Sequence, residues 1–122
     1  LLHKAIYHES HLNMIKYVYE LCPQSISYKD NMGCLPLHLI TSLDSLYYIY
    51  ELYPDAIFIP DNNGNYVLHN VAQNYPHLFF DVYTLYKNAI KTPNNFGLLP
   101  FHFVVQQNIA PEIIEDFIYD IY

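Results

Sequence analysis

Four histidines recur along the chain at nearly equal intervals; they are His3, His38, His69 and His102. Three glycines keep the same rhythm, each five residues before a histidine; they are Gly33, Gly64 and Gly97. A period of about 33 residues is typical of proteins in which one small unit is copied and the copies stack to bury a shared core. We therefore expect a repeat architecture.

The repeat is constant in length before each histidine and variable after it. Ten residues before the glycines stand Pro23, Pro54 and Lys87, so the segment from this position to the histidine is fixed. The stretch from each histidine to the next such position differs from copy to copy, and it is shortest after His38. A loop that stacks on its neighbours must keep its register, whereas a joint between helices can absorb extra residues. The pattern predicts one fixed loop and two helices in each copy.

The fixed segment has the composition of a turn that leads into a helix. Asp30 and Asn31 favour a turn because their side chains bond nearby backbone, and Gly33 accepts a positive φ. Pro36 and Pro100 fit the first turn of a helix, where a missing N–H costs nothing. Second helices are expected at residues 11–21, 45–53, 76–86 and 111–121. The residues expected to start them are Ser10, Asp44 or Ser45, Pro76 and Pro111.

The loop sequences resemble the ankyrin repeat, whose pattern is D-x-x-G-x-T-P-L-H-x-A. The matching segments are Asp30–His38, Asp61–Ala72 and Asn94–His102. The resemblance implies an all-α fold, an ankyrin-like α-solenoid of about four stacked helix–turn–helix repeats joined by hairpin-like loops. It implies one domain, 1–122, with repeats at 1–34, 35–65, 66–98 and 99–122, the first and last incomplete.

This chain departs from the ankyrin pattern at two places. The family threonine that bonds with the histidine is replaced by Leu35, Tyr66 and Leu99, so the histidine needs another partner. The usual Gly-Ala after the second helix is replaced by segments that begin with Pro23, Pro54 and Lys87, so the helix ends are expected to differ.

The resemblance implies a non-catalytic scaffold that binds a protein partner through its loop tips and the concave face of its first helices. The matching loop positions are Lys29, Asn31, Met32, Cys34, Pro60, Asn62, Asn63, Asn65, Pro93, Asn95, Phe96 and Leu98. The matching helix positions are Ser42, Gln73, Asn74, Gln106 and Gln107. A second interpretation applies to Asn31, Asn62 and Asn95: because this position is asparagine in every loop, these residues have a structural role instead. The alternative function is a regulatory or targeting repeat segment of a larger multidomain enzyme.

Charge and composition argue against other classes of partner. The net charge is −7, with only 5 Lys and Arg residues, so neither nucleic acid nor an anionic membrane surface is an expected partner. No run of about 18 apolar residues predicts a membrane span. The two cysteines do not suggest a disulfide framework, which favours an intracellular, cytoplasmic location.

Candidate chemical sites are better explained as structure. The four repeated histidines are not accompanied by further ligands, so we assign them, with the three glycines, to structural roles and expect no metal or other cofactor. His8 and His11 lack a ligand set, Cys34 lacks a base, and the acidic residues Glu115, Asp116 and Asp120 fit a solvated helix face. We therefore expect no enzymatic activity.

The last predicted helix is apolar on several sides. Its apolar residues are Ile113, Ile114, Phe117, Ile118, Ile121 and Tyr122. Terminal repeats normally carry a polar outer face. We therefore expect the natural protein to continue on the C-terminal side, and the isolated chain to self-associate through uncapped ends.

Overall fold

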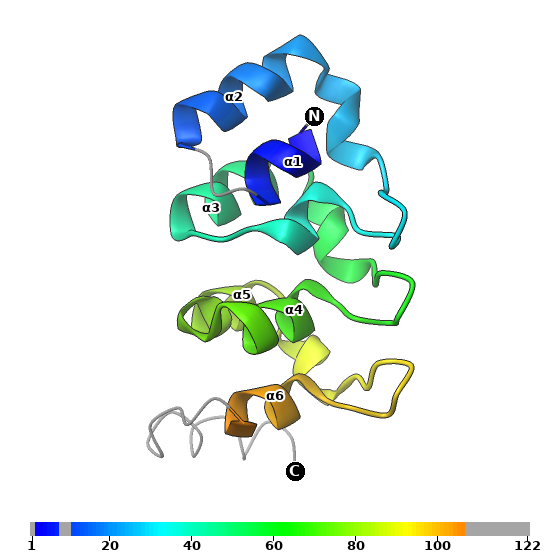
Figure 1. The fold of residues 1–122 in the computed structure, drawn as a ribbon. Helices are drawn as coiled ribbons and strands as arrows, with labels where there is room; N and C mark the ends of the chain where they lie inside the picture. Colours follow the sequence, from blue (N-terminus) through cyan, green and yellow to red (C-terminus); the bar gives the residue numbers. More distant parts are fainter. Residues whose placement is uncertain (1, 8–10, 107–122) are drawn as a thin grey trace. The chain divides into compact units, whose positions relative to one another are not determined.

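The computed structural model describes residues 2–7 and 11–106 (Figure 1). Every regular element in these ranges is an α-helix or a 3₁₀ helix, so the all-helical prediction is confirmed at this level. The chain divides into two compact units, Leu1–Asn62 and Asn63–Tyr122, each described here by itself. Within the described ranges, no helix is both long and apolar enough to span a membrane.

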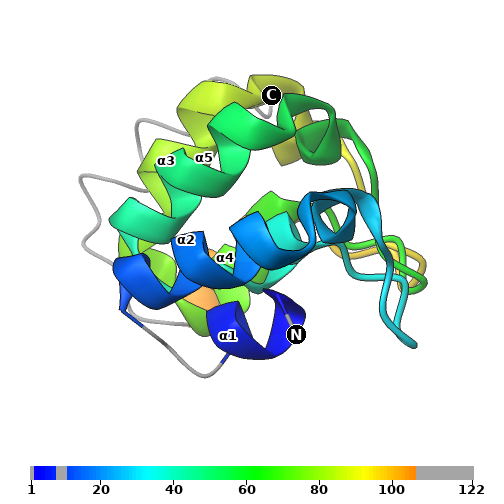
Figure 2. The same ribbon diagram turned by 90° about the horizontal axis from the view of Figure 1, so that it is seen from above.

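The first unit is built from two successive copies of the repeat. Its elements, with η for a 3₁₀ helix, are α1 (Leu2–Tyr7), α2 (Leu12–Leu21), η1 (Pro23–Ser27), η2 (Pro36–Leu39), α3 (Leu43–Leu52) and η3 (Pro54–Phe58). Helices α1 and α2 lie side by side (Figure 2). Leu2 and Ile6 of α1 are fully buried. Ile15 of α2, and Leu46 and Ile49 of α3, are at most 2% exposed. These side chains form the hydrophobic core of the unit.

The second unit repeats the plan with a longer first helix. Its elements are α4 (Val67–Asn74), η4 (Pro76–Leu78), α5 (Phe79–Leu85), η5 (Lys87–Lys91) and α6 (Pro100–Gln106). Helix α4 contacts both α5 and α6. The core is made by Leu68 and Val71 of α4, Val82 of α5, Ile90 of η5 and Val104 of α6, all almost fully buried.

The first helix of the second copy is only one 3₁₀ turn, η2. The sequence offers a physical reason, because the stretch between His38 and Pro54 is the shortest of its kind in the chain. Once the ten residues of α3 are placed in this stretch, little chain is left for the helix that precedes it. The variable length predicted after the histidine is thus taken up by the first helix.

The start of α3 corrects one expectation. Asp44 or Ser45 was the expected start, but the N-cap is Ser42, whose Oγ accepts a hydrogen bond from the Ser45 N–H at 3.2 Å. Ser45 Oγ in turn accepts from the Ser42 N–H at 3.2 Å. This reciprocal capping box satisfies two backbone donors at the helix start. The predictions that concern His8, Ser10, Gln107 and residues 111–121 fall outside the described residues.

The second helices end in the same way in all three described copies. Cys22, Tyr53 and Tyr86 follow α2, α3 and α5 with φ values of −148°, −149° and −150°. Pro23 and Pro54 disfavour the α conformation in the residue before them, which explains the first two helix ends. Lys87 has no such effect, yet Tyr86 adopts the same conformation. Each helix thus ends at a non-helical residue with φ near −150° rather than at a glycine.

Candidate protein-interaction surface

The loop around Gly33 is held in shape by its own first acidic residue. Asp30 Oδ1 accepts hydrogen bonds from the backbone N–H groups of Met32 and Cys34, both at 2.9 Å. The Gly33 N–H donates to the Asp30 carbonyl at 3.0 Å, and Gly33 has a φ of 77°. One carboxylate therefore fixes the backbone on both sides of the glycine, as expected of a short acidic side chain in a turn.

The loop around Gly97 uses an amide in the same position. Asn94 Oδ1 accepts from the N–H groups of Phe96 at 2.9 Å and Leu98 at 3.0 Å. Gly97 also has a φ of 77°, and its N–H donates to the Asn94 carbonyl at 3.0 Å. The two loops thus share one backbone form although they differ at the first position, at the residue before the glycine and at the residue after it.

Successive loops are joined through their backbones within each unit. In the first unit, the Asn62 N–H donates to the Met32 carbonyl at 2.9 Å, and Asn62 Nδ2–H donates to the Asn31 carbonyl at 3.3 Å. In the second unit, the Asn95 N–H donates to the Asn63 carbonyl at 2.9 Å. The invariant asparagines therefore take part in loop packing, which was the second interpretation of that column.

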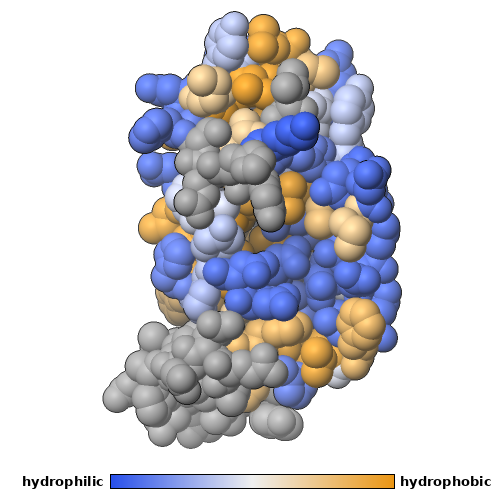
Figure 3. Space-filling view, viewed as in Figure 1, coloured by the Kyte–Doolittle hydropathy of each residue, from blue (hydrophilic) through white to orange (hydrophobic). Residues whose placement is uncertain are grey.

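We call the residue immediately before each glycine the tip residue; the three are Met32, Asn63 and Phe96. The Met32 and Phe96 side chains are 55% and 71% exposed, whereas Asn63 is half-buried. In Figure 3 the loop-bearing edge of each unit is mainly hydrophilic, with hydrophobic residues interrupting it. An apolar side chain held in the open on a fixed backbone is a typical anchor for a protein partner.

The histidines of the first unit connect a helix start to a following loop. His38 Nδ1 accepts the Leu35 N–H at 2.9 Å, and its Nε2 lies 2.8 Å from the Ile59 carbonyl. A ring that accepts at Nδ1 and donates from Nε2 is the neutral Nε2–H tautomer. His3 Nε2 lies 3.0 Å from the Cys34 carbonyl in the same manner. The backbone N–H of Leu35 is thus the local hydrogen-bond donor to the ring of His38.

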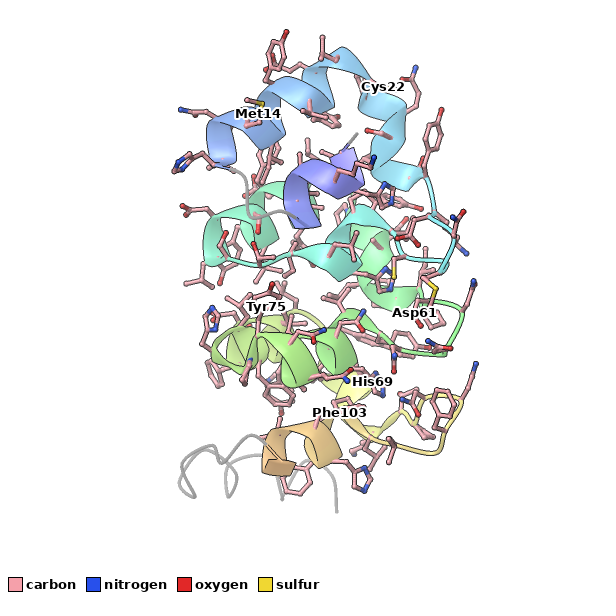
Figure 4. The ribbon with its side chains drawn as sticks, in the orientation of Figure 1. Met14, Cys22, Asp61, His69, Tyr75 and Phe103 are labelled. Carbon is pink, nitrogen blue, oxygen red and sulfur yellow. The ribbon has the colours of Figure 1, made fainter. Side chains whose placement is uncertain are left out.

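The second unit contains the same arrangement with more aromatic contact. His69 Nδ1 accepts the Tyr66 N–H at 3.1 Å, and its Nε2 donates to the Leu98 carbonyl at 3.2 Å. The centre of the His69 ring lies 6.1 Å from the centre of the Tyr66 ring and 6.4 Å from that of the Phe103 ring. His69 and Phe103 are labelled in Figure 4. The exposed His102 accepts the Leu99 N–H at 2.8 Å. Both nitrogens of His69 are engaged, so the ring serves the fold.

The protonation of His38 gives the fold a pH dependence. Burial lowers the pKa of His38 below its ordinary value of 6.5, against the smaller opposing effects of Ile59, Asp61, Leu35 and Asp30. Well above pH 6.5 the ring is neutral in both folded and unfolded chains. Below that pH the unfolded chain takes the proton first, so stability falls as the pH drops toward the pKa of the folded state.

We expect this loss to be smaller when residue 38 cannot titrate. The free energy of unfolding of the unchanged chain and of the His38→Gln variant is measured by urea unfolding at pH 7.5 and at pH 5.5. The variant is less stable at pH 7.5 but loses less stability between the two pH values. An equal loss in both proteins would contradict the assigned role of His38.

Cys34 differs from the expectation for a loop-tip residue. Its side chain is only 7% exposed. Burial, with smaller contributions from Asp30 and Asp61, raises the pKa of Cys34 to about 12. The thiol donates toward Asp61 Oδ2 at 3.8 Å. A thiol that stays protonated at neutral pH is a poor nucleophile and a poor surface contact.

The other predicted binding residues lie mostly in the open. The exposed ones are Lys29, Asn31, Met32, Ser42, Asn62, Gln73, Asn74, Pro93, Asn95 and Phe96. Ser42 is the N-cap of α3 and does not lie on a first helix as expected. The half-buried ones are Pro60, Asn63, Asn65 and Leu98. Asn65 Oδ1 accepts a bond from Asn94 Nδ2 at 2.8 Å, which ties it to the neighbouring loop. Gln106 lies in α6, and its side chain is outside the described part of the structure.

The sequence interpretation missed one surface. Met14, Tyr17 and Leu21 of α2 are all more than half exposed, and their spacing of three and four residues puts them on one helix face. The signal was visible in the sequence, but a helix with apolar residues on several sides does not reveal which side is uncovered.

Among residues 2–7 and 11–106, no three His, Cys, Asp or Glu side chains come together as a metal site would require. A comparison of the chain with protein-family models finds no match, and neither does a comparison with curated proteins.

Proposed function

We propose that this chain is a non-catalytic protein-interaction scaffold of ankyrin-like repeats, which binds a protein partner through its loop tips and exposed first-helix residues. The observation that carries the proposal is the contrast between backbone and side chain at the tips. The backbone around Met32 and Phe96 is fixed by Asp30 and Asn94, while the two tip side chains are exposed. Such a surface is ordered before binding, which lowers the entropy cost of forming a complex.

The composition of the surface supports a protein as partner. Phe96 has the largest exposed fraction of the large hydrophobic side chains in the described ranges. Aromatic anchors surrounded by polar groups are typical of protein interfaces, and the exposed Asn95 supplies such a group beside Phe96. The described cysteines, Cys22 and Cys34, are not paired, which fits the reducing interior of a cell.

Exchange of the tip residues tests the proposal. A photo-crosslinking amino acid at position 96 identifies the partner, and the Kd of the purified complex is then measured for Met32→Asn and Phe96→Asn. Asparagine is the natural residue at the tip position 63, so the loop accepts it. We expect each change to weaken binding about tenfold, the usual loss for an interface anchor, and to leave the unfolding midpoint unchanged.

Phe58→Asn is the matched control, because Phe58 is 54% exposed but lies on η3 outside the loop tips. It should leave the Kd unchanged. An unchanged Kd in the Met32→Asn and Phe96→Asn double variant would refute the role of the tips, and a loss in Phe58→Asn alone would move the interface elsewhere.

A further inference from the structure

Helix α2 has an apolar face that is open in the structure. Met14, Tyr17 and Leu21 are 52%, 58% and 61% exposed, and Val18 beside them is half-buried. Figure 4 shows Met14 on α2. The core residue Ile15 occupies a different side of the helix. Three large apolar side chains on one open helix face are more than scattered surface residues.

The internal repeat shows what this face corresponds to. The column formed by Pro23 and Pro54 places α2 one copy before α3. Met14, Tyr17 and Leu21 therefore correspond to Ser45, Tyr48 and Leu52; this second set is covered. Ser45 is 2% exposed, and Tyr48 and Leu52 are half-buried.

Helix α2 contacts this face of α3 at Tyr48. The ring of Tyr19 meets that of Tyr48 edge-on at 6.2 Å, and Lys16 Nζ lies 5.5 Å from the centre of the Tyr48 ring. These are an aromatic pair and a cation–π contact of ordinary geometry. The receiving tyrosine is present in both copies, because Tyr17 stands in α2 where Tyr48 stands in α3.

We propose that the open face of α2 binds a further helix hairpin of the same pattern as residues 2–21. The hairpin contributes an aromatic ring and a lysine to Tyr17, as Tyr19 and Lys16 contribute theirs to Tyr48. A second copy of the whole chain does not fit this role, because its own Tyr19 and Lys16 already contact its own Tyr48. The proposal does not depend on what the loop tips bind.

The experiment adds such a hairpin and follows the exposure of Met14. A copy of residues 1–35 is fused directly before Leu1, which keeps the spacing between Gly33 of the copy and the next histidine. Met14→Leu and Met32→Leu in the added copy leave only the two original methionines, since the chain has no others. Peroxide oxidation of each methionine is then measured by peptide mass spectrometry.

We expect oxidation of the original Met14 to slow severalfold in the fusion, while oxidation of the original Met32, at its exposed loop tip, stays unchanged. A control fusion that carries Lys16→Asp and Tyr19→Asp in the added copy removes the two groups that should meet Tyr17. In that control the protection of Met14 is expected to be lost.

Three outcomes would overturn the proposal. The first is an unchanged oxidation rate of the original Met14 in a fusion whose circular dichroism shows that the added copy is helical. The second is a fusion whose added copy does not become helical. The same sequence forms α2 beside α3, so it should also be helical beside the original α2. The third is protection of Met14 in the unextended chain that grows with protein concentration, since that would identify a second copy as the occupant. None of these results bears on the Kd of the tip variants.

Discussion

Alanine at Gly33 or Gly64 is expected to destabilise the chain by about 3 kcal/mol or more, because strain in the backbone adds to a steric clash. Both glycines have a φ of 77°, which disfavours any residue with a Cβ. A Cβ on Gly33 would also lie 2.9 Å from the backbone N of Asn62, and one on Gly64 would lie 2.8 Å from the backbone N of Asn95. These atoms are in the backbone of the following loop and cannot simply rotate away.

Gly97 is the matched control, because it shares the φ of 77° but a Cβ there would meet nothing within 4 Å. Gly97→Ala should therefore cost only the conformational strain, about 1–2 kcal/mol. Urea unfolding followed by circular dichroism at pH 7.5 gives the three values. Equal losses at the three positions would show that close packing of successive loops does not contribute to stability.

Alanine at His69 is expected to cost about 3 kcal/mol, since it removes two hydrogen bonds and leaves buried polar groups without partners. His69 is 1% exposed and joins the Tyr66 N–H to the Leu98 carbonyl. Its ring also contacts the rings of Tyr66 and Phe103, and these contacts are lost as well.

His102→Ala is the comparison for this loss. His102 occupies the same repeat position, accepts the Leu99 N–H and is exposed, so water can replace its ring. We expect a loss of about 0.5–1 kcal/mol, the usual net value of one exposed hydrogen bond. Thermal or urea unfolding measures both losses. If they were equal, the hydrogen bond from His69 to the following loop would not contribute to stability.

The helices could be predicted from the sequence because their signals are local. The expected segments 11–21, 45–53 and 76–86 agree with α2, α3 and the η4–α5 pair to within two residues. Turn residues, prolines and apolar spacing act over a few positions and need no knowledge of the rest of the chain. The start of α3 was misjudged because Thr41, Ser42, Asp44 and Ser45 offer several caps in a row.

The candidate interaction surface was predictable only in part. The tips Met32 and Phe96 were proposed from the resemblance to the ankyrin loop positions, and both side chains are exposed. Cys34 was grouped with them, but its side chain is only 7% exposed, a burial that the sequence of the loop does not reveal. The partners of His38 and His69 could not be predicted either, because nearly every residue has a backbone N–H and it leaves no mark in the sequence.

The histidine bonds also bear on how the chain acquires order. They join residues 31, 21 and 29 positions apart, from His3, His38 and His69 to the loop that follows each of them. The entropy lost on closing a loop grows only with the logarithm of its length, so these three closures have nearly the same cost. Each of these closures can therefore form without a rare encounter between distant ends of the polypeptide.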